Sequence, residues 1–283
     1  MLTVLQPACE PISLSEAKSI VKQDVSDDDA LLTAAIIAAR EMAHAETQRQ
    51  IVCARYRLDL DAFPGPSLLG VPWGSPYSIP AHAILLSKGP LVQVVSIQYL
   101  DMGGTWRTLT ENTDYVVEST RDAARITPPF GKIWPIPMPQ IGCVRVTFDV
   151  GEIAAITADA TADTITPVLW KPLSVGDPVV FSNSGGALPT PLVAGTTYYV
   201  QSIPSAGSYK LAQTSDGAAI DITGTGSGLS FLGAIPQGLL AWMRLRLGSL
   251  DLYRAEALTV AKGKLEPLPF VDSLLNGYRI IVA

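Results

Sequence analysis

The sequence is poor in the residue types from which most catalytic and metal centres are built. Its 283 residues include two histidines and three cysteines, and the cysteines lie far apart with no C-x-x-C pair. This spacing favours neither a disulfide framework nor a cysteine zinc site, and it fits a reducing compartment. His44 and His82 do not have the spacing of a zinc motif, and no G-x-S-x-G elbow occurs. We therefore expect no enzyme, no metal and no cofactor.

Positive charge and long apolar runs are also scarce. The formal net charge is -6, whereas proteins that hold nucleic acid by neutralising phosphates carry basic faces. The apolar run 34–39 ends at Arg40, far short of the roughly 20 residues that cross a bilayer. Residues 1–11 lack the basic start of a signal peptide. We expect neither stable nucleic-acid binding nor membrane insertion nor secretion by a signal peptide.

Two short runs could suggest ligand binding. Asp27-Asp28-Asp29 could hold a divalent cation, but carboxylates at a helix start also stabilise the helix dipole, and metal sites usually draw on more scattered donors. The glycine-rich stretch 224–228 lacks the lysine and the strand-to-helix context of a phosphate loop. We interpret the first run as a helix start and the second as a turn tract.

Helical patterns occupy both ends of the chain. Ser13 and Glu16 have the spacing of a capping box and predict a helix that ends near Gln23. A second helix is predicted from the Asp27–Asp29 run to about Gln48, and a third from Leu239 to about Ala257. The second helix is rich in alanine, which allows close packing on more than one face. A short amphipathic segment, 270–278, is expected to close the chain.

Between these helices the hydrophobic period changes to two, which predicts strands. The strand-like segments are residues 51–62, Ala83 to Leu86, Val92 to Leu100, Trp106 to Leu109, Tyr115 to Val117 and Val144 to Phe148. Gly103-Gly104 is expected to form a hairpin turn between the third and fourth segments. The stretches 63–80 and 128–135 are rich in proline and are predicted to be irregular.

Residues 152–235 differ in composition from both flanks. Eight of these 84 residues are charged, and the block is dense in Thr, Ser, Gly, Val and Ala. Without it, the flanks join as a strand-to-helix connection. We therefore expect an α+β protein with an inserted all-β domain at 152–235 and a discontinuous domain made of 1–151 and 236–283. On this interpretation, deletion of 154–234 should leave the remainder folded.

The order of segments in the flanks resembles the bacteriophage head–tail connector (adaptor) family over residues 12–151 and 236–280. The resemblance rests on the order and spacing of several pieces, which are Ser13-Leu14-Ser15-Glu16-Ala17, Tyr56-Arg57-Leu58-Asp59-Leu60-Asp61-Ala62-Phe63-Pro64, Lys88-Gly89-Pro90, Asp114-Tyr115-Val116-Val117, Ala124-Arg125-Ile126, Phe130-Gly131-Lys132 with Trp134-Pro135, and Leu268-Pro269-Phe270. The inserted block departs from the family pattern and looks like a small β module of other phage virion proteins.

The resemblance implies a helical connector domain: N-terminal helices, a β-sheet segment and a long C-terminal helix. It further implies a non-enzymatic virion protein that forms a homo-oligomeric ring, a dodecamer in the family, in the neck between the portal and the tail of a tailed phage. Its partners would be the portal protein and tail or neck proteins, with transient, non-specific contact to DNA in the channel. The protein would be assembled in the host cytoplasm and would then be located in the neck of the virion.

Two apolar surfaces are candidates for contacts in such a ring. A ring needs a heterologous interface, in which one patch meets a different patch of the next copy. Ile36 and Ala39 on the second helix could meet a neighbour or could belong to the chain's own core. The terminal segment could dock in a portal groove or pack back on its own domain. Its candidate residues are Phe270, Leu274, Leu275, Tyr278 and Arg279.

Two other classes of function stay open at this point. The chain could be a tail-completion or baseplate protein in which the β insertion is the main working part. It could also be a hydrolase or a carbohydrate-binding protein that presents some of its five tryptophans to a sugar. The tryptophans are scattered over loop, strand and helix patterns, so cores and interfaces explain them better. The insertion, with its charge-poor surface, is expected to project from the ring and contact a neighbouring virion protein.

Overall fold

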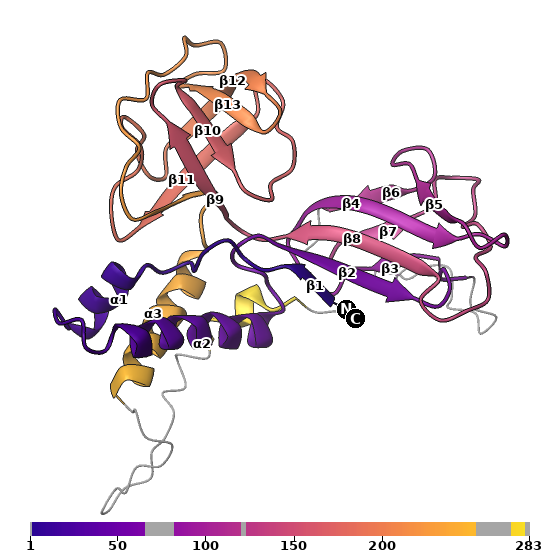
Figure 1. Cartoon of the computed structure of the whole chain (residues 1–283), viewed down its shortest axis with the longest axis horizontal. Helices are drawn as coiled ribbons and strands as arrows, with labels where there is room; N and C mark the ends of the chain where they lie inside the picture. The colour runs from indigo at the N-terminus through magenta and orange to yellow at the C-terminus, as the bar shows by residue number, and fades with distance from the viewer. Residues whose placement is uncertain (1, 66–81, 120–122, 253–272, 281–283) are drawn as a thin grey trace, which may run out of the picture. The chain divides into compact units, whose positions relative to one another are not determined.

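The structure is a computed structural model that describes residues 2–65, 82–119, 123–252 and 273–280. The fold is α+β, with helices and antiparallel sheets in separate parts of the chain (Figure 1). The chain divides into two compact units. Unit 1 contains residues 1–6, 54–151 and 280–283, and unit 2 contains residues 7–53 and 152–279.

Unit 1 contains two antiparallel sheets around one core. The larger sheet has the order β1-β2-β8-β4-β5, formed by Leu2–Leu5, Ala54–Leu60, Val144–Val150, Leu91–Leu100 and Trp106–Leu109. The smaller sheet has the order β3-β7-β6, formed by Ile84–Leu85, Arg125–Thr127 and Val116–Glu118. Ile97 and Phe148 of the larger sheet and Ile126 of the smaller one are fully buried in the same cluster. Apolar side chains between the sheets therefore hold unit 1 together.

A buried carboxylate lies in the middle of the larger sheet. Asp149 of β8 is fully buried, and the Arg55 guanidinium of β2 donates to both of its oxygens at 2.7 and 2.9 Å. The Gln93 amide of β4 adds a third bond of 2.7 Å. Because these three residues lie on adjacent strands, the hydrogen bonds fix the register at the centre of the sheet.

Unit 2 begins with the two predicted N-terminal helices. Helix α1 spans Leu14–Val21, and α2 spans Asp29–Thr47. The Ser13 hydroxyl accepts a hydrogen bond from the Glu16 N–H at 3.2 Å, as the capping pattern predicts. Lys22 and Gln48 end the two helices in the left-handed conformation. Helix α3 spans Gln237–Leu252, and a turn of 3₁₀ helix, η1, covers Asn276–Tyr278.

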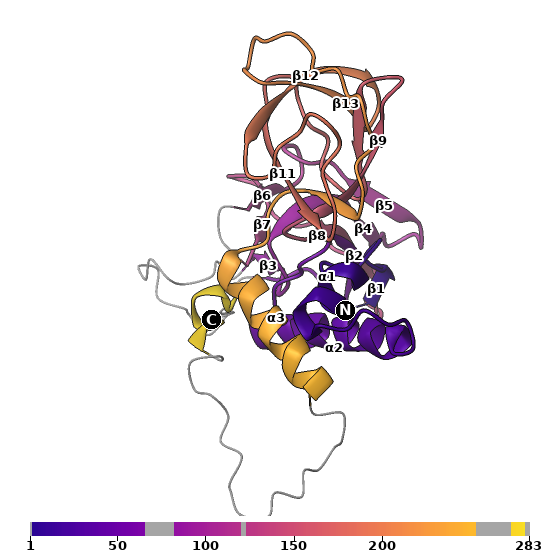
Figure 2. The ribbon, with the colours of Figure 1, turned by 90° about the vertical axis from the view of Figure 1, so that its left-hand side faces the viewer.

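Strands β9 to β14 of unit 2 close into an antiparallel barrel in the order β10-β13-β12-β11-β14-β9 (Figure 2). The strands are Ala154–Asp159, Thr164–Pro167, Pro178–Ser184, Thr197–Ser205, Ser208–Ala212 and Leu229–Leu232. The barrel has its own core, in which Phe181, Val200 and Leu211 are buried. The Thr-, Val- and Ala-rich composition of this block thus corresponds to short strands with an apolar inner face.

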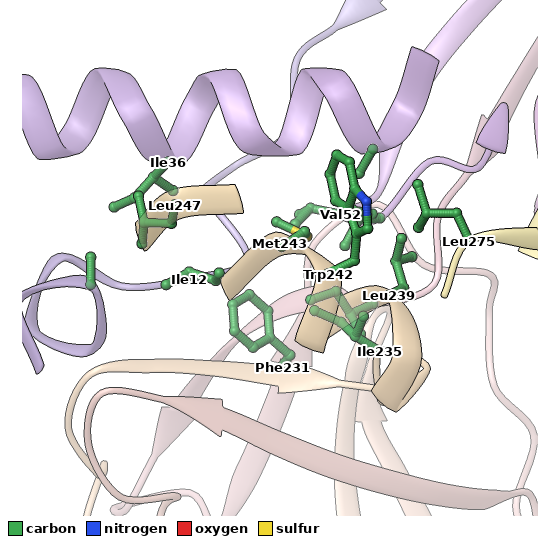
Figure 3. Packing of buried hydrophobic residues seen from close by; sticks show 14 residues of the cluster. Ile12, Ile36, Val52, Phe231, Ile235, Leu239, Trp242, Met243, Leu247 and Leu275 are labelled. Atoms are coloured by element: carbon green, nitrogen blue, oxygen red, sulfur yellow. The ribbon is translucent and has the colours of Figure 1, made fainter. Parts of the chain in front are cut away.

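A second core joins the barrel to the helices. Phe231 of β14 is 2% exposed and belongs to the same cluster as Ile36 of α2 and Trp242 of α3 (Figure 3). Ile12 and Leu275 complete this core from two further segments (Figure 3). Residues 152–235 therefore share a unit with the described helices α1, α2 and α3. That these residues fold alone, as an inserted domain would, stays a prediction.

Some details differ from the sequence-based expectations. Strands β1 and β7 had not been predicted as strands, and both are short. The expected loop 63–80 and the expected end of the third helix near Ala257 lie largely outside the described residues. In the described part of the expected amphipathic segment 270–278, Ser273 is helical, and a turn and η1 follow it. None of the described helices is long and apolar enough to cross a membrane.

Candidate interaction surfaces

The surroundings of His44 and Cys9 indicate structural roles for both residues. His44 is buried, and its Nε2 accepts a hydrogen bond from the Ile51 N–H at 3.1 Å. Burial and the neighbouring Glu10 carboxylate raise the pKa of the Cys9 thiol to about 11, so the thiolate nucleophile is rare at neutral pH. No group of three potential metal ligands occurs among the described residues, and Asp29 pairs with Lys18 at 2.5 Å. The candidate functional sites of the described residues are therefore sought on the surface of the molecule.

A polar junction joins the start of α1 to the end of β11. The Ser13 N–H donates to the Ser184 hydroxyl at 2.7 Å, so Ser184 takes the place that Glu16 holds in a capping box. The Ser184 hydroxyl in turn donates to the Glu16 carboxylate, which also accepts two bonds from Arg244 of α3 at 2.9 and 2.6 Å. We call Ser13, Ser15, Glu16, Ser184, Gly185 and Arg244 the junction.

Gly185 lets the two chain segments of the junction approach each other. Its φ is +68°, and a Cβ at this position would lie 1.9 Å from the Ser13 hydroxyl oxygen and 2.1 Å from that of Ser15. Its carbonyl accepts a hydrogen bond from the Ser15 hydroxyl at 3.0 Å. A side chain here would displace the Ser13 hydroxyl from its capping position, displace the Ser15 hydroxyl as well, or move α1 away from the barrel.

The candidate residues on α2 lie on the inner face of the helix. Ile36 is 3% exposed and Ala39 is fully buried, so both belong to the core of unit 2. A contact of these two side chains with another copy stays a prediction, and it would require unit 2 to open. The sequence showed that the helix has apolar residues on more than one face. It did not show which face packs on the chain itself.

The outer face of α2 carries an exposed apolar stripe. Leu31 is 46% exposed and Met42 is 38% exposed. Ala34 and Ala45 are exposed and Ala38 is half-buried between them. The spacing 31, 34, 38, 42, 45 places these five residues along one side of the helix. We call them the α2 stripe.

The terminal segment is divided between core and surface. Leu275 is buried in the helical core, and Leu274 and Tyr278 pack against that core while remaining partly exposed. Arg279 is exposed and pairs with Glu46 of α2 at 3.0 Å. Phe270 lies outside the described residues. A portal contact of this segment stays a prediction, and its described surface would consist of Leu274, Tyr278 and Arg279.

The end of the unit 1 sheet carries the most exposed apolar side chains. Strand β2 ends at this edge, β4 ends beside it, and β8 begins there after the irregular stretch 128–142. Within that stretch Phe130 is 108% exposed, Ile133 and Ile141 are both 88% exposed, and Ile136 is 79% exposed. We call residues 128–142 the tip loop. The prolines predict irregular structure over residues 128–135, but the sequence pattern does not predict an exposed apolar surface there. The available signal was the presence of six large apolar residues beside a single charge, Lys132.

The tip loop is held in place at its base. Trp134 is 7% exposed, stacks on Phe63 with ring centroids 4.7 Å apart, and donates its indole N–H to the His82 carbonyl at 2.7 Å. The Met138 N–H donates a hydrogen bond to the Leu100 carbonyl, and the Gly142 N–H donates one to the Asp61 carboxylate. These two bonds hold the rest of the loop. The exposed side chains therefore project from a fixed backbone.

A groove of about 570 Å³ lies beside two of these side chains, Ile133 and Ile136. Its lining includes Phe63, Trp134, Ile133, Ile136 and prolines of the tip loop. Lys132, the single charged residue of the loop, donates its ammonium to the Thr113 carbonyl. Aromatic and proline-lined grooves of this kind are typical sites for apolar side chains of a partner.

Comparison with known proteins identifies the fold. No family model and no curated protein matches the sequence. One solved chain that is similar in structure comes from the neck of an empty gene transfer agent (GTA) particle, computed with C6 symmetry. It has a TM-score of 0.53 and 14% identity, and the alignment covers 100% of this chain and 97% of the other. A chain from the virion of a native GTA particle has a TM-score of 0.52 and 13% identity, with 99% and 97% covered. At these identities the likeness establishes a shared fold.

Proposed function

We propose that this chain is a non-enzymatic structural protein of the neck of a tailed phage or a phage-like particle. The observation that carries the proposal is the length of the structural match. Solved chains from the neck and the virion of GTA particles align with almost the whole of this chain and with 97% of their own length. A shared fold alone does not define a function. The proposal gains support because the order of segments in the flanks independently resembles the phage connector family.

In this role, copies of the chain stand side by side in a ring that joins the portal to the tail and lets DNA pass. The C6 symmetry of the similar GTA neck supports a symmetric assembly. A closed ring requires a different patch on each side of every copy. The α2 stripe is a suitable patch, because it is apolar, exposed and carried by a helix whose other face is fixed in the core.

The terminal segment is the proposed contact to the portal. Leu274 and Tyr278 present partly exposed apolar surface next to the exposed Arg279. An apolar segment bordered by a cation can occupy a groove on a partner. The net charge of -6 is compatible with DNA that passes a channel and is not held there.

Electron microscopy and mass photometry of the purified full chain test the proposal. We expect rings with cyclic symmetry, either alone or after mixing with the portal protein of the same particle. The substitution Tyr278→Ser should weaken portal capture, and Val193→Ser, at an exposed site on the barrel, should leave it unchanged. A chain that stays monomeric with and without the portal would overturn the proposal.

A further inference from the structure

The tip loop and the α2 stripe are both exposed apolar surfaces on the described part of the chain, and they lie in different units. Phe130 touches so little of its own chain that its exposure reaches 108%. Leaving large apolar side chains in water forgoes the free energy that their burial would release. Contiguous exposed apolar patches on folded proteins commonly mark interaction sites.

The symmetry of a ring restricts how two such patches can be used. If the tip loop met the tip loop of another copy, the contact would be isologous and would close as a pair. The same holds for a contact between two α2 stripes. A contact between the tip loop of one copy and the α2 stripe of the next is heterologous, and it can be repeated around a ring.

The spacing of the α2 stripe suits a groove of this kind. The groove of the tip loop is lined by Phe63, Trp134 and Ile133, and an amphipathic helix typically binds an apolar groove through residues spaced by three, four and seven positions. The α2 stripe has this spacing from Leu31 to Ala45. Leu31 and Met42 are its two large side chains, and both are more than one third exposed.

Charge and rigidity agree with this pairing. The tip loop carries one charge, the cation of Lys132, and the α2 stripe is bordered by the exposed carboxylate of Glu41. Trp134 and the five prolines of the loop fix its backbone, so little conformational entropy remains to be lost on binding. An apolar contact between fixed surfaces with opposite charges at the border is favourable.

We propose that the tip loop of one copy binds the α2 stripe of the neighbouring copy, with Leu31 or Met42 in the groove beside Trp134. This inference rests on the proposed function as a ring protein and names both halves of its interface. The occupant of the groove is therefore a second copy of this chain. The contact supplies an apolar centre, and other surfaces of the two copies complete the interface.

Cross-linking between separate chains tests the pairing directly. A tagged Phe130→Cys chain and an untagged Met42→Cys chain are mixed under assembly conditions and treated with a short thiol cross-linker. We expect a product that joins the two variants, in excess over products that join like with like. Cys53 and Cys143 are buried and the thiol of Cys9 has a pKa of about 11, so the background should be low. A Val193→Cys chain in place of Met42→Cys is the matched control and should give no product.

Two substitutions measure the strength of the contact. Phe130→Ser and Met42→Ser each remove an exposed side chain, so both variants should unfold at the temperature of the original chain. Each should weaken self-association by about tenfold or more, the loss typical of a central apolar anchor. The double variant should lose less than the two single losses combined, because both residues belong to one contact.

The possible results separate this inference from the ring proposal. Rings that form equally well with both substitutions and give no cross-link overturn the inference and leave the ring standing. A cross-link between Phe130→Cys and Met42→Cys in open filaments supports the contact and overturns the ring. Preferential cross-linking of Phe130→Cys to itself shows a tip-to-tip contact, and linkage within one chain in a double-cysteine variant shows that the chain fills its own groove. Each of these last two results overturns the inference.

Discussion

The junction of unit 2 and the tip loop of unit 1 are both irregular segments at the ends of strands, yet they are built in opposite ways. At the junction, serine hydroxyls, a carboxylate and a guanidinium satisfy one another, and Ser13 and Ser184 are buried. At the tip loop, apolar side chains project into solvent from a braced backbone. The first segment joins parts of one chain, whereas the second leaves apolar surface uncovered, and we propose that it binds a second copy of the chain.

Removal of the barrel tests the junction most severely. Replacing residues 154–234 by a short Gly/Ser linker removes Phe231 and Ser184 and exposes the core around Trp242. Burial of these apolar side chains stabilises the helices, so we expect unit 2 to lose its fold. The expectation from sequence was the reverse. Circular dichroism at 222 nm and solubility of the deletion variant decide between them, and a soluble variant with intact helices would favour the original expectation.

The next largest effect is expected at Gly185. In the variant Gly185→Ala, the new methyl group meets the Ser13 and Ser15 hydroxyls in a backbone conformation that is already unfavourable for alanine. We expect the free energy of unfolding to fall by about 3 kcal/mol or more. Urea denaturation measures this loss. Gly195→Ala is the matched control, because its φ is +75° and no atom lies within 4 Å of the added Cβ, so a loss of about 1 kcal/mol is expected.

A smaller effect is expected at Ser184. The variant Ser184→Ala removes the acceptor of the Ser13 N–H and a donor to Glu16, and both groups lie in a mostly covered site. A lost bond that leaves a covered polar group without a partner costs about 1–3 kcal/mol. Thermal unfolding of this variant should show that loss, and Ser182→Ala, which removes a hydroxyl bond to Gly233 within the barrel, serves as the comparison. Equal losses in the two variants would mean that the Ser184 hydrogen bonds at the junction stabilise the fold no more than an ordinary hydrogen bond of the barrel does.

The smallest effect is expected at the exposed β4–β5 hairpin of unit 1. The Arg107 guanidinium, together with backbone N–H groups of Thr105 and Gly103, lowers the pKa of the Asp101 carboxyl. A pKa lowered by folding contributes stability above the unfolded-state pKa, and this contribution is lost as the pH falls through the folded-state value. Arg107→Gln should therefore raise the pKa of Asp101, as NMR titration would show. Because the pair is exposed, the unfolding temperature near pH 7 should barely change.

Local sequence signals predicted the elements that depend on them. Ser13 marked the start of α1, the aspartate run marked the start of α2, and the alternation around Tyr56 marked β2. The short strands β1 and β7 carry too few residues for a periodic pattern, and each pairs with a strand that is distant in sequence, although β7 also pairs with the nearby β6. The pattern of a strand is visible locally, whereas its pairing is a property of the whole fold.

The interaction surfaces were harder to predict for a related reason. The composition of α2 shows two apolar faces, and only the packing of Trp242 and Phe231 reveals that Ile36 lies on the inner one. Likewise, the prolines around Trp134 indicate irregular structure, but they do not show that Phe130 and Ile133 remain uncovered. Exposure depends on what the rest of the chain covers, which the local sequence does not encode.

Closure of the barrel has a consequence for a crowded particle. Open sheets present backbone donors and acceptors at their outermost strands, where a foreign strand can add and begin a fibre. Strands β9 and β10 pair with each other and complete the circle, so the described barrel offers no such starting point. Many copies can therefore be held at high local concentration with their barrels uncovered, without seeding aggregation through these strands.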